Sequence, residues 1–246
     1  HNRSIYSFSD PGKNCCSEEF LMLEEICSRK QEGLVLCTAS NRLGNGMIIN
    51  ANNLSIKKSI RLNSSTQEFG WGKEVSLKNL FGCYNNDMAI AVNVAGCRFS
   101  QRINLSCFVL DSKGSLLPGG FLFYGRKSLY DDILMYSDTK DTKLCVFRTS
   151  IMLRDVSRVV GILSIYDGLE NGLTFSMVDS LELLVLNPTT GKTVNSIRVP
   201  KDNSNSTMIE LFHIKRSKED WNFRLSGIKA RMNLADLCRH YGINVK

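Results

Sequence analysis

The strongest hydrophobic pattern in the chain lies at residues 158–186. Two runs, 159–166 and 175–186, are rich in Val, Ile and Leu and are separated by a turn-rich segment at 167–172. Apolar runs of this length bounded by Gly and Asn are typical of strands that are buried on at least one face. Such strands need further strands around them, so the pattern predicts that most of the chain forms one β core.

Shorter apolar runs follow one another from Trp71 onward. Tight-turn sequences separate some of them, as at 111–114 and 187–192. Many short strands at roughly even spacing predict a β-sandwich, and the fold class is therefore mainly β. Besides 159–166 and 175–186, the predicted strands are 88–94, 103–110, 121–124, 144–149, 194–199, 208–214 and 221–225.

The last element is predicted to be a helix. Asn233 can cap it, Leu234, Leu237 and Cys238 share an inward face, and Gly242 ends it. We therefore expect a sandwich that closes with a C-terminal helix.

The first seventy residues have a different pattern of hydrophobic and polar positions. Residues 1–16 form a polar arm, 17–33 predict an amphipathic helix, and 34–37 with 47–49 predict two short strands of a hairpin. The Ser- and Asn-rich stretch 55–67 is interpreted as a connection. The chain is thus expected to consist of a small α/β extension, 1–70, and a sandwich domain, 71–246.

Composition indicates an ordinary globular protein. The chain is 43% hydrophobic and 22% charged, and it has no apolar run near the roughly 18 residues that a membrane helix needs. It begins at His1 without an initiator Met, which indicates a truncated or processed start. Its nine cysteines contain no C-x-x-C pair. They predict reduced thiols and a cytoplasmic location rather than a disulfide framework or a zinc site.

Positive charge is concentrated near the C-terminus. The formal charge is +7, and residues 213–246 hold eight Lys or Arg against three Asp or Glu. This tail could bind anionic lipid, which would place the protein peripherally at a membrane surface, or nucleic acid; a solvated basic face is the alternative. The candidate binding residues are Lys215, Arg216, Lys218, Lys229 and Arg231.

Catalytic patterns are missing from the sequence. There is no G-x-S-x-G, H-E-x-x-H, phosphate-binding or dinucleotide-binding motif. The histidines, His1, His213 and His240, are interpreted as structural rather than catalytic. We expect a protein that is not an enzyme and takes no small-molecule substrate.

Several segments of residues 71–246 resemble the TerD family of tellurium-resistance and stress-response proteins. Seven short motifs in the family's order carry the resemblance, which implies the same β-sandwich that the strand count predicts. The motifs are GKEVSL at 72–77, SCFVLD at 106–111, FY at 123–124, SIYDG at 164–168, FSMV at 175–178, WNFR at 221–224 and YGIN at 241–244.

The resemblance also implies a calcium site built from acidic loops, since Ca²⁺ takes six to eight oxygen ligands. The family's D-x-D falls on Arg102 and Asn104, and its G-D-N on 137–139. The ligands that remain for a degenerate site are Asp138, Asp141, Asn104 and Thr139, with Lys143 close to the position of a family Glu. Alternatively, Asp138 and Asp141 are solvated acids paired with Lys140 or Arg102.

The resemblance and the missing motifs together predict a non-enzymatic interaction or scaffolding module in a stress- or defence-related assembly, with a protein partner and no required cofactor. A calcium-binding stress-response protein is the first alternative. A basic surface that binds anionic lipid or nucleic acid is the second.

Overall fold

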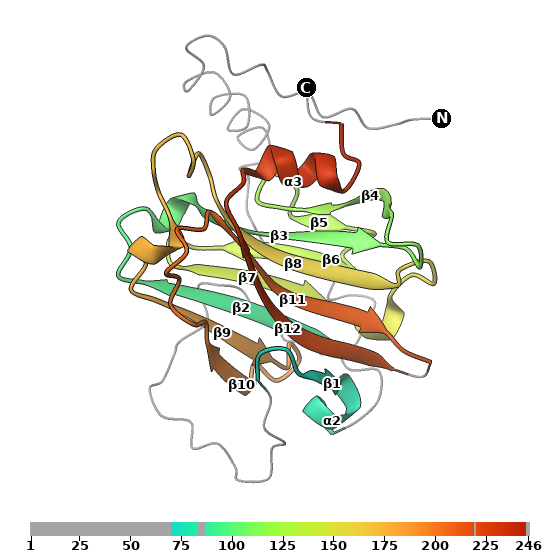
Figure 1. Ribbon diagram of the computed structural model, residues 1–246. Helices are drawn as coiled ribbons and strands as arrows, with labels where there is room; N and C mark the ends of the chain where they lie inside the picture. The colour runs from blue at the N-terminus through green and yellow to red at the C-terminus, as the bar shows by residue number, and fades with distance from the viewer. Residues whose placement is uncertain (1–69, 83–86, 219, 245–246) are drawn as a thin grey trace, which may run out of the picture.

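The computed structural model describes residues 70–82, 87–218 and 220–244, and in these it is a sandwich of two sheets (Figure 1). The helix, hairpin and connection predicted within residues 1–70 lie outside the described residues. For the described residues, the prediction of a mainly β sandwich with a C-terminal helix is confirmed.

Each sheet has six antiparallel strands. Sheet A has the order β1-β12-β11-β8-β3-β4, and sheet B has the order β10-β9-β2-β7-β6-β5. The strands of sheet A are β1 (Glu74–Ser76), β3 (Ile103–Leu110), β4 (Leu116–Leu122), β8 (Arg158–Ile165), β11 (Met208–Arg216) and β12 (Trp221–Ala230). Those of sheet B are β2 (Met88–Ala95), β5 (Ser128–Leu129), β6 (Leu134–Asp138), β7 (Thr142–Phe147), β9 (Ser180–Leu186) and β10 (Thr193–Arg198).

The two strongest apolar runs do not pair with each other. β8 lies between β3 and β11 in sheet A, whereas β9 lies between β2 and β10 in sheet B. The second run also starts later than predicted, because Phe175–Met177 forms a 3₁₀ turn instead of a strand. The sequence prediction missed the short strands β1 and β5, the strand β6 and the one-turn helix α2 (Leu77–Phe81), since none carries a long apolar run.

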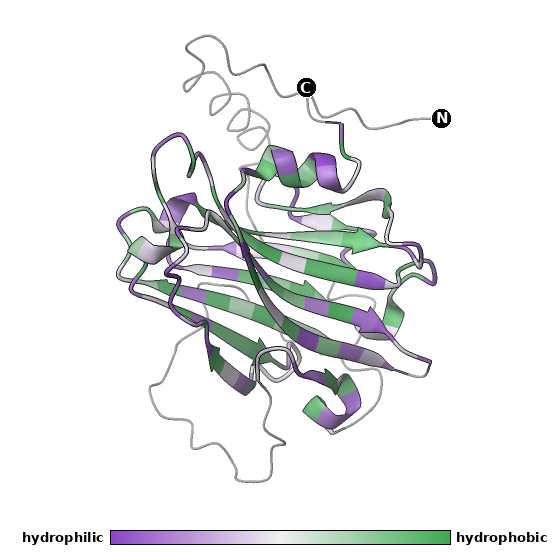
Figure 2. Ribbon diagram, viewed as in Figure 1, coloured by the Kyte–Doolittle hydropathy of each residue, from purple (hydrophilic) through white to green (hydrophobic). Residues whose placement is uncertain are grey.

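Part of the outer face of sheet A packs against α3 (Leu234–His240), which explains why β3 and β8 are apolar on both of their faces. Figure 2 shows the hydrophobic residues along these strands. In β3, Ile103, Leu105 and Cys107 point into the core between the sheets. Phe108 and Leu110 point outward and pack with α3. Asn233 caps α3 as predicted, because its Oδ1 accepts a hydrogen bond from the Asp236 amide at 2.8 Å.

The cysteines of the described residues are free thiols, as predicted. Cys107 and Cys145 face each other across the two sheets with a Sγ–Sγ distance of 3.7 Å, and Cys238 lies on the buried face of α3. Within the described part of the chain, no helix has the length and apolar character needed to cross a membrane.

Candidate functional site

The turn between β6 and β7 holds most of the residues predicted to bind calcium. Asp138 ends β6, and the turn 139–142 is closed by the Thr139 amide, which donates to the Thr142 carbonyl at 2.8 Å. The Thr142 amide in turn donates to Thr139 Oγ1 at 3.1 Å. The backbone amide and the side-chain hydroxyl of Thr139 therefore both form hydrogen bonds within the turn.

Lys143 places an ammonium group inside this turn. The residue is only 1% exposed, and its Nζ donates to the Thr139 carbonyl at 2.8 Å and to the Lys140 carbonyl at 3.4 Å. Burial lowers the pKa of Lys143, while the carboxylates of Asp138 and Asp141 act in the opposite direction. Carbonyl oxygens that could have coordinated a metal ion thus already have a cationic partner.

Asp138 is engaged as well. Its Oδ1 accepts a hydrogen bond from Lys127 Nζ at 2.9 Å, so Lys127 is the partner rather than Lys140 or Arg102. Arg102 lies 3.8 Å from Asp167 instead. Arg102 also lines a cleft of about 610 Å³, and Arg98 is a second cationic residue that lines this cleft.

Asn104 does not join the turn. It alternates with Ile103 and Leu105, whose side chains face the core, so its own side chain lies on the outer face of sheet A. Its Nδ2 donates to the Arg102 carbonyl at 3.3 Å. Asp141 is exposed, and its carbonyl accepts from the Val94 amide at 2.8 Å.

The oxygen atoms of this turn do not fit a calcium site. Ca²⁺ needs several free oxygen ligands, including carboxylates. Here the turn carbonyls accept hydrogen bonds from the ammonium group of Lys143, and Asp138 accepts one from that of Lys127. Among residues 70–82, 87–218 and 220–244, there is no group of three or more His, Cys, Asp or Glu that could hold a metal ion.

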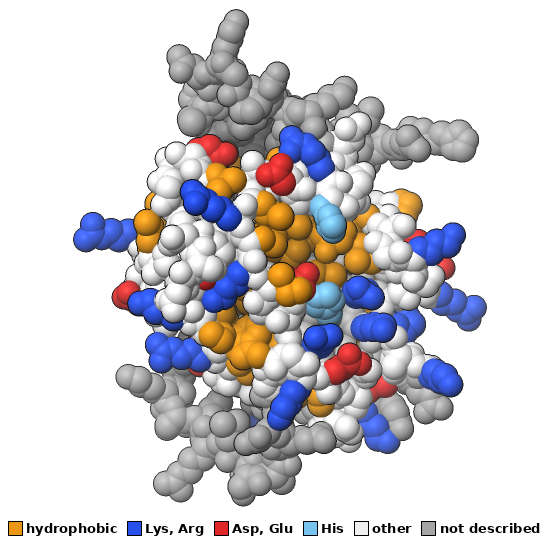
Figure 3. Space-filling view, in the orientation of Figure 1, with side chains coloured by type: hydrophobic (Ala, Val, Ile, Leu, Met, Phe, Trp, Pro, Cys, Tyr) orange, Lys and Arg blue, Asp and Glu red, His pale blue; other side chains and the backbone are white. Residues whose placement is uncertain are grey.

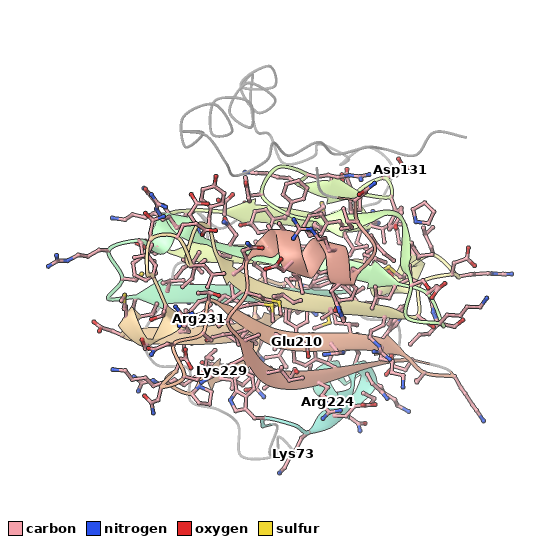
Figure 4. All side chains as sticks on the ribbon, turned by 45° about the horizontal axis from the view of Figure 1, so that its top comes forward. Lys73, Asp131, Glu210, Arg224, Lys229 and Arg231 are labelled. Carbon is pink, nitrogen blue, oxygen red and sulfur yellow. The ribbon has the colours of Figure 1, made fainter. Side chains whose placement is uncertain are left out.

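The predicted basic residues are spread over the molecule. Arg216 is used internally: its Nε donates to the Val156 carbonyl at 2.8 Å, and its guanidinium lies 4.3 Å from the centre of the Trp221 ring. Lys229 lies 3.3 Å from Asp202. Figure 4 shows Lys229 and Arg231 together, away from Arg224, and Lys218 lies in the turn between β11 and β12.

A different set of basic residues gathers on the outer face of sheet A. We call Arg158, Lys215 and Arg224, which lie around His213, the cationic cluster. Lys215 is directly opposite Arg158, and His213 is directly opposite Arg224. Figure 3 shows Lys and Arg side chains around one of the two histidines on this face. No ion pair joins Arg158, Lys215 or Arg224 to an acid of the described part.

The sequence prediction found only Lys215 of this cluster. Arg158 lies far away in the chain, and Arg224 was missed although its position in β12 places it next to His213. The available signal was the alternation of polar residues in β11 and β12, since outward residues of neighbouring strands meet on one face.

The cluster borders a partly buried carboxylate, Glu210, which is labelled in Figure 4. His213 Nε2 lies 2.6 Å from Glu210 Oε1, and Ser226 Oγ donates to the same oxygen. Burial acts to raise the pKa of Glu210, but the bonds from His213 and Ser226 outweigh it, and the pKa lies below its usual range. Ser226 and His213 thus both bind the carboxylate instead of each other, which is not the arrangement of a nucleophile and its base.

The comparisons with known proteins agree with this fold. Residues 69–241 match the TerD domain, which is most of the chain, and the chain therefore belongs to the TerD domain family. It is 25% identical over 133 residues to chemical-damaging agent resistance protein B of Clostridium acetobutylicum, covering 51% of this chain and 95% of that protein.

Solved structures show the same architecture. One is a homologue of telluride resistance protein from Streptomyces coelicolor A3(2), with a TM-score of 0.51 and 12% identity, covering 62% of this chain and 94% of that one. Another, a protein of unknown function, has a TM-score of 0.51 and 14% identity, covering 65% of this chain and 98% of that one. At these identities the likeness concerns the fold.

Proposed function

We propose that this chain is a non-enzymatic interaction module in a chemical-damage or tellurium-resistance response, and that it works without calcium. Family membership and the relative from Clostridium acetobutylicum support the cellular role. The observation that carries the calcium-free interpretation is the pair of ammonium groups in the β6–β7 turn, Lys143 on Thr139 and Lys127 on Asp138.

A fixed ammonium group makes the turn independent of a metal. A dication entering beside Lys143 would meet like charge, and it would have to displace hydrogen bonds that are already formed. The turn therefore serves as a constant structural element of the module rather than as a calcium sensor.

Calcium is expected to leave the thermal stability unchanged. A site with calcium at a hundred times its Kd would add about 2.7 kcal/mol, which is roughly 5–10 °C for a domain of this size. We expect no such rise between EDTA and millimolar CaCl₂. Asp138→Ala should lower the melting temperature by only a few degrees, equally in both buffers, because it removes a half-exposed ion pair.

The control for this experiment is Asp111→Ala, which removes a carboxylate from a different turn, where it accepts from the Lys113 and Ser115 amides. A calcium-dependent rise in the wild type that is lost only in Asp138→Ala would restore the calcium-binding alternative and overturn the proposal.

A second candidate function is binding to an anionic lipid surface through the cationic cluster. Like charges directly opposite each other on a sheet are destabilising, and Arg158 faces Lys215 in this way. An anionic partner would relieve this repulsion. Ile228, which is 59% exposed on neighbouring β12, adds an apolar contact that suits a membrane surface better than a nucleic acid.

Charge reversal in the cluster is expected to weaken this binding strongly. Lys215→Glu with Arg224→Glu should reduce co-sedimentation with phosphatidylserine vesicles by at least about tenfold, since each cation near such a surface is worth about 1 kcal/mol. The charge-matched control is Lys113→Glu with Lys192→Glu, in two exposed turns, which should change binding less than twofold. Equal losses in both double variants, or retention on an oligonucleotide but not on vesicles, would argue against a lipid site.

A further inference from the structure

The cleft that Arg98 and Arg102 line lies at one end of the sandwich, between two connections. One joins β2 to β3 and the other joins β8 to β9 (Figure 1). The start of β3 lies opposite the end of β8 in sheet A, and the end of β2 lies opposite the start of β9 in sheet B. Both connections therefore leave the sheets at the same end, and the Tyr166 amide joins them by donating to the Arg102 carbonyl at 2.8 Å.

The two arginines keep most of their hydrogen-bond donors available. Both residues are exposed. No hydrogen bond or ion pair joins the Arg98 side chain to another residue of the described part of the chain. Arg102 lies 3.8 Å from Asp167, and this ion pair contributes little because both side chains are partly exposed. A guanidinium group binds a carboxylate with two parallel hydrogen bonds, so the pair suits an acidic ligand.

The nearby acids leave the lining of the cleft positive. Asp167 lies beside Arg102, and the Asp179 side chain lies against Gly96. Neither carboxylate lines the cleft, and the charged residues that do so in the described part of the chain are Arg98 and Arg102. The surface that a ligand would contact therefore attracts negative charge.

The cleft also has an apolar floor. Phe99 and Leu173 are half-buried and pack against the main core, which holds them in place. Met177 lines the cleft with them and is 53% exposed. An exposed Met beside fixed aromatic and aliphatic side chains is typical of surfaces that bind apolar residues of other proteins.

Asn171 adds a hydrogen-bond acceptor to the lining. Its Nδ2 donates to the Asp167 carbonyl at 2.9 Å, and its Oδ1 has no hydrogen-bond partner within residues 70–82, 87–218 and 220–244. A backbone N–H of a peptide can donate to this oxygen. The phosphodiester groups of lipids and nucleic acids carry no such donor, so the lining favours a peptide.

Together these features define the chemistry of the ligand. We propose that the cleft binds an acidic segment of a partner protein, with carboxylates on the two arginines and a neighbouring aliphatic side chain on the apolar floor. Its volume of about 610 Å³ lies within the range of ligand sites in proteins. Such a segment would belong to the partner of the interaction module proposed for this chain, on which the inference rests.

Selection from random heptapeptides displayed on phage tests the proposal with the full chain as bait. Arg98→Gln with Arg102→Gln serves for counter-selection, so that peptides retained only by the wild type are kept. We expect these peptides to combine Asp or Glu with Leu, Ile or Val. Fluorescein-labelled synthetic copies should bind the double variant at least about tenfold more weakly in fluorescence anisotropy, because hydrogen bonds between charged groups are the stronger ones.

Arg154→Gln with Lys192→Gln is the charge-matched control. Both side chains are exposed and lie near the other end of the strands, so this variant should change binding less than about twofold. Met177→Ser should weaken binding by at least about threefold, since it removes an apolar contact. Ile151→Ser, which changes a 48% exposed residue of a different loop, should not. Unchanged melting temperatures confirm that each variant is folded.

Three outcomes would overturn the proposal. They are a selection without acidic and aliphatic residues in common, equal losses in the two double variants, and displacement of the selected peptides by an oligonucleotide at lower concentration, which would identify nucleic acid as the ligand. Binding is measured in EDTA and in millimolar CaCl₂. If the peptides fail in both buffers and calcium leaves the melting temperature unchanged, the assignment of the cleft is wrong while the calcium-free module stands.

Discussion

Replacing Gly161 with alanine is expected to lower the free energy of unfolding by about 3 kcal/mol, an overpacking cost at the upper end of the usual range. Gly161 lies in β8 opposite Phe212 of β11, and an added Cβ would lie 2.1 Å from the Phe212 ring. The ring cannot move freely, because Phe147 and Phe223 each lie 5.8 Å from it. Urea unfolding followed by tryptophan fluorescence measures the loss.

The second substitution Phe212→Leu tests this cause. If the clash dominates, Gly161→Ala with Phe212→Leu should be more stable than the sum of the two single losses predicts, by about 1–2 kcal/mol. Gly70→Ala is the control, because its Cβ meets nothing within 4 Å and its backbone is not left-handed. An unchanged stability of Gly161→Ala would show that the core can absorb the methyl group.

Replacing Asp202 with alanine is expected to cost about 3 kcal/mol, since hydrogen bonds to a charged group are among the stronger ones. The Asp202 side chain is 1% exposed and holds the loop after β10. It accepts from the Ser204 amide and hydroxyl at 3.0 and 2.7 Å and from the Ser206 amide and hydroxyl at 2.8 and 2.7 Å. Lys229 Nζ lies 3.3 Å away.

The same carboxylate predicts a pH dependence. Burial acts to raise the pKa of Asp202, but the hydrogen bonds from Ser204 and Ser206 outweigh it, and the pKa lies well below its usual range. A depressed carboxylate stabilises the folded state fully above the unfolded pKa of about 3.9, and this stability is lost as the pH falls toward the folded pKa. The difference in the free energy of unfolding between the wild type and Asp202→Asn should therefore be smaller at pH 3 than at pH 7.

Urea unfolding at both pH values provides the measurement. Asp141→Ala removes an exposed acid and serves as the control, with an expected change below about 0.5 kcal/mol. If the free energies of unfolding of the wild type and Asp202→Asn differ by the same amount at pH 3 and at pH 7, the charge of Asp202 does not contribute to stability.

Lys143 and Arg216 show where sequence reasoning about charged residues reaches its limit. Both were interpreted as positive charges at a site or on a surface. In the structure, Lys143 binds carbonyls of its own turn, and Arg216 binds carbonyls of the segment 152–156 and covers Trp221. A Lys or Arg side chain can bury its methylene groups and direct its charged group toward the protein interior. Whether it does so depends on carbonyl groups without hydrogen-bond partners, which only the folded chain brings close to it.

The sequence by itself determined the features that depend on neighbouring residues. Apolar runs specified the strands, Asn233 specified the start of α3, and short motifs specified the TerD family. Only the tertiary structure decided which strands share a sheet and which side chains oppose each other. β8 and β9 are close in sequence but lie in different sheets, while Arg158 and Lys215 are far apart and meet directly. The reason is that strand pairing is fixed by long-range packing and register, which no local pattern contains.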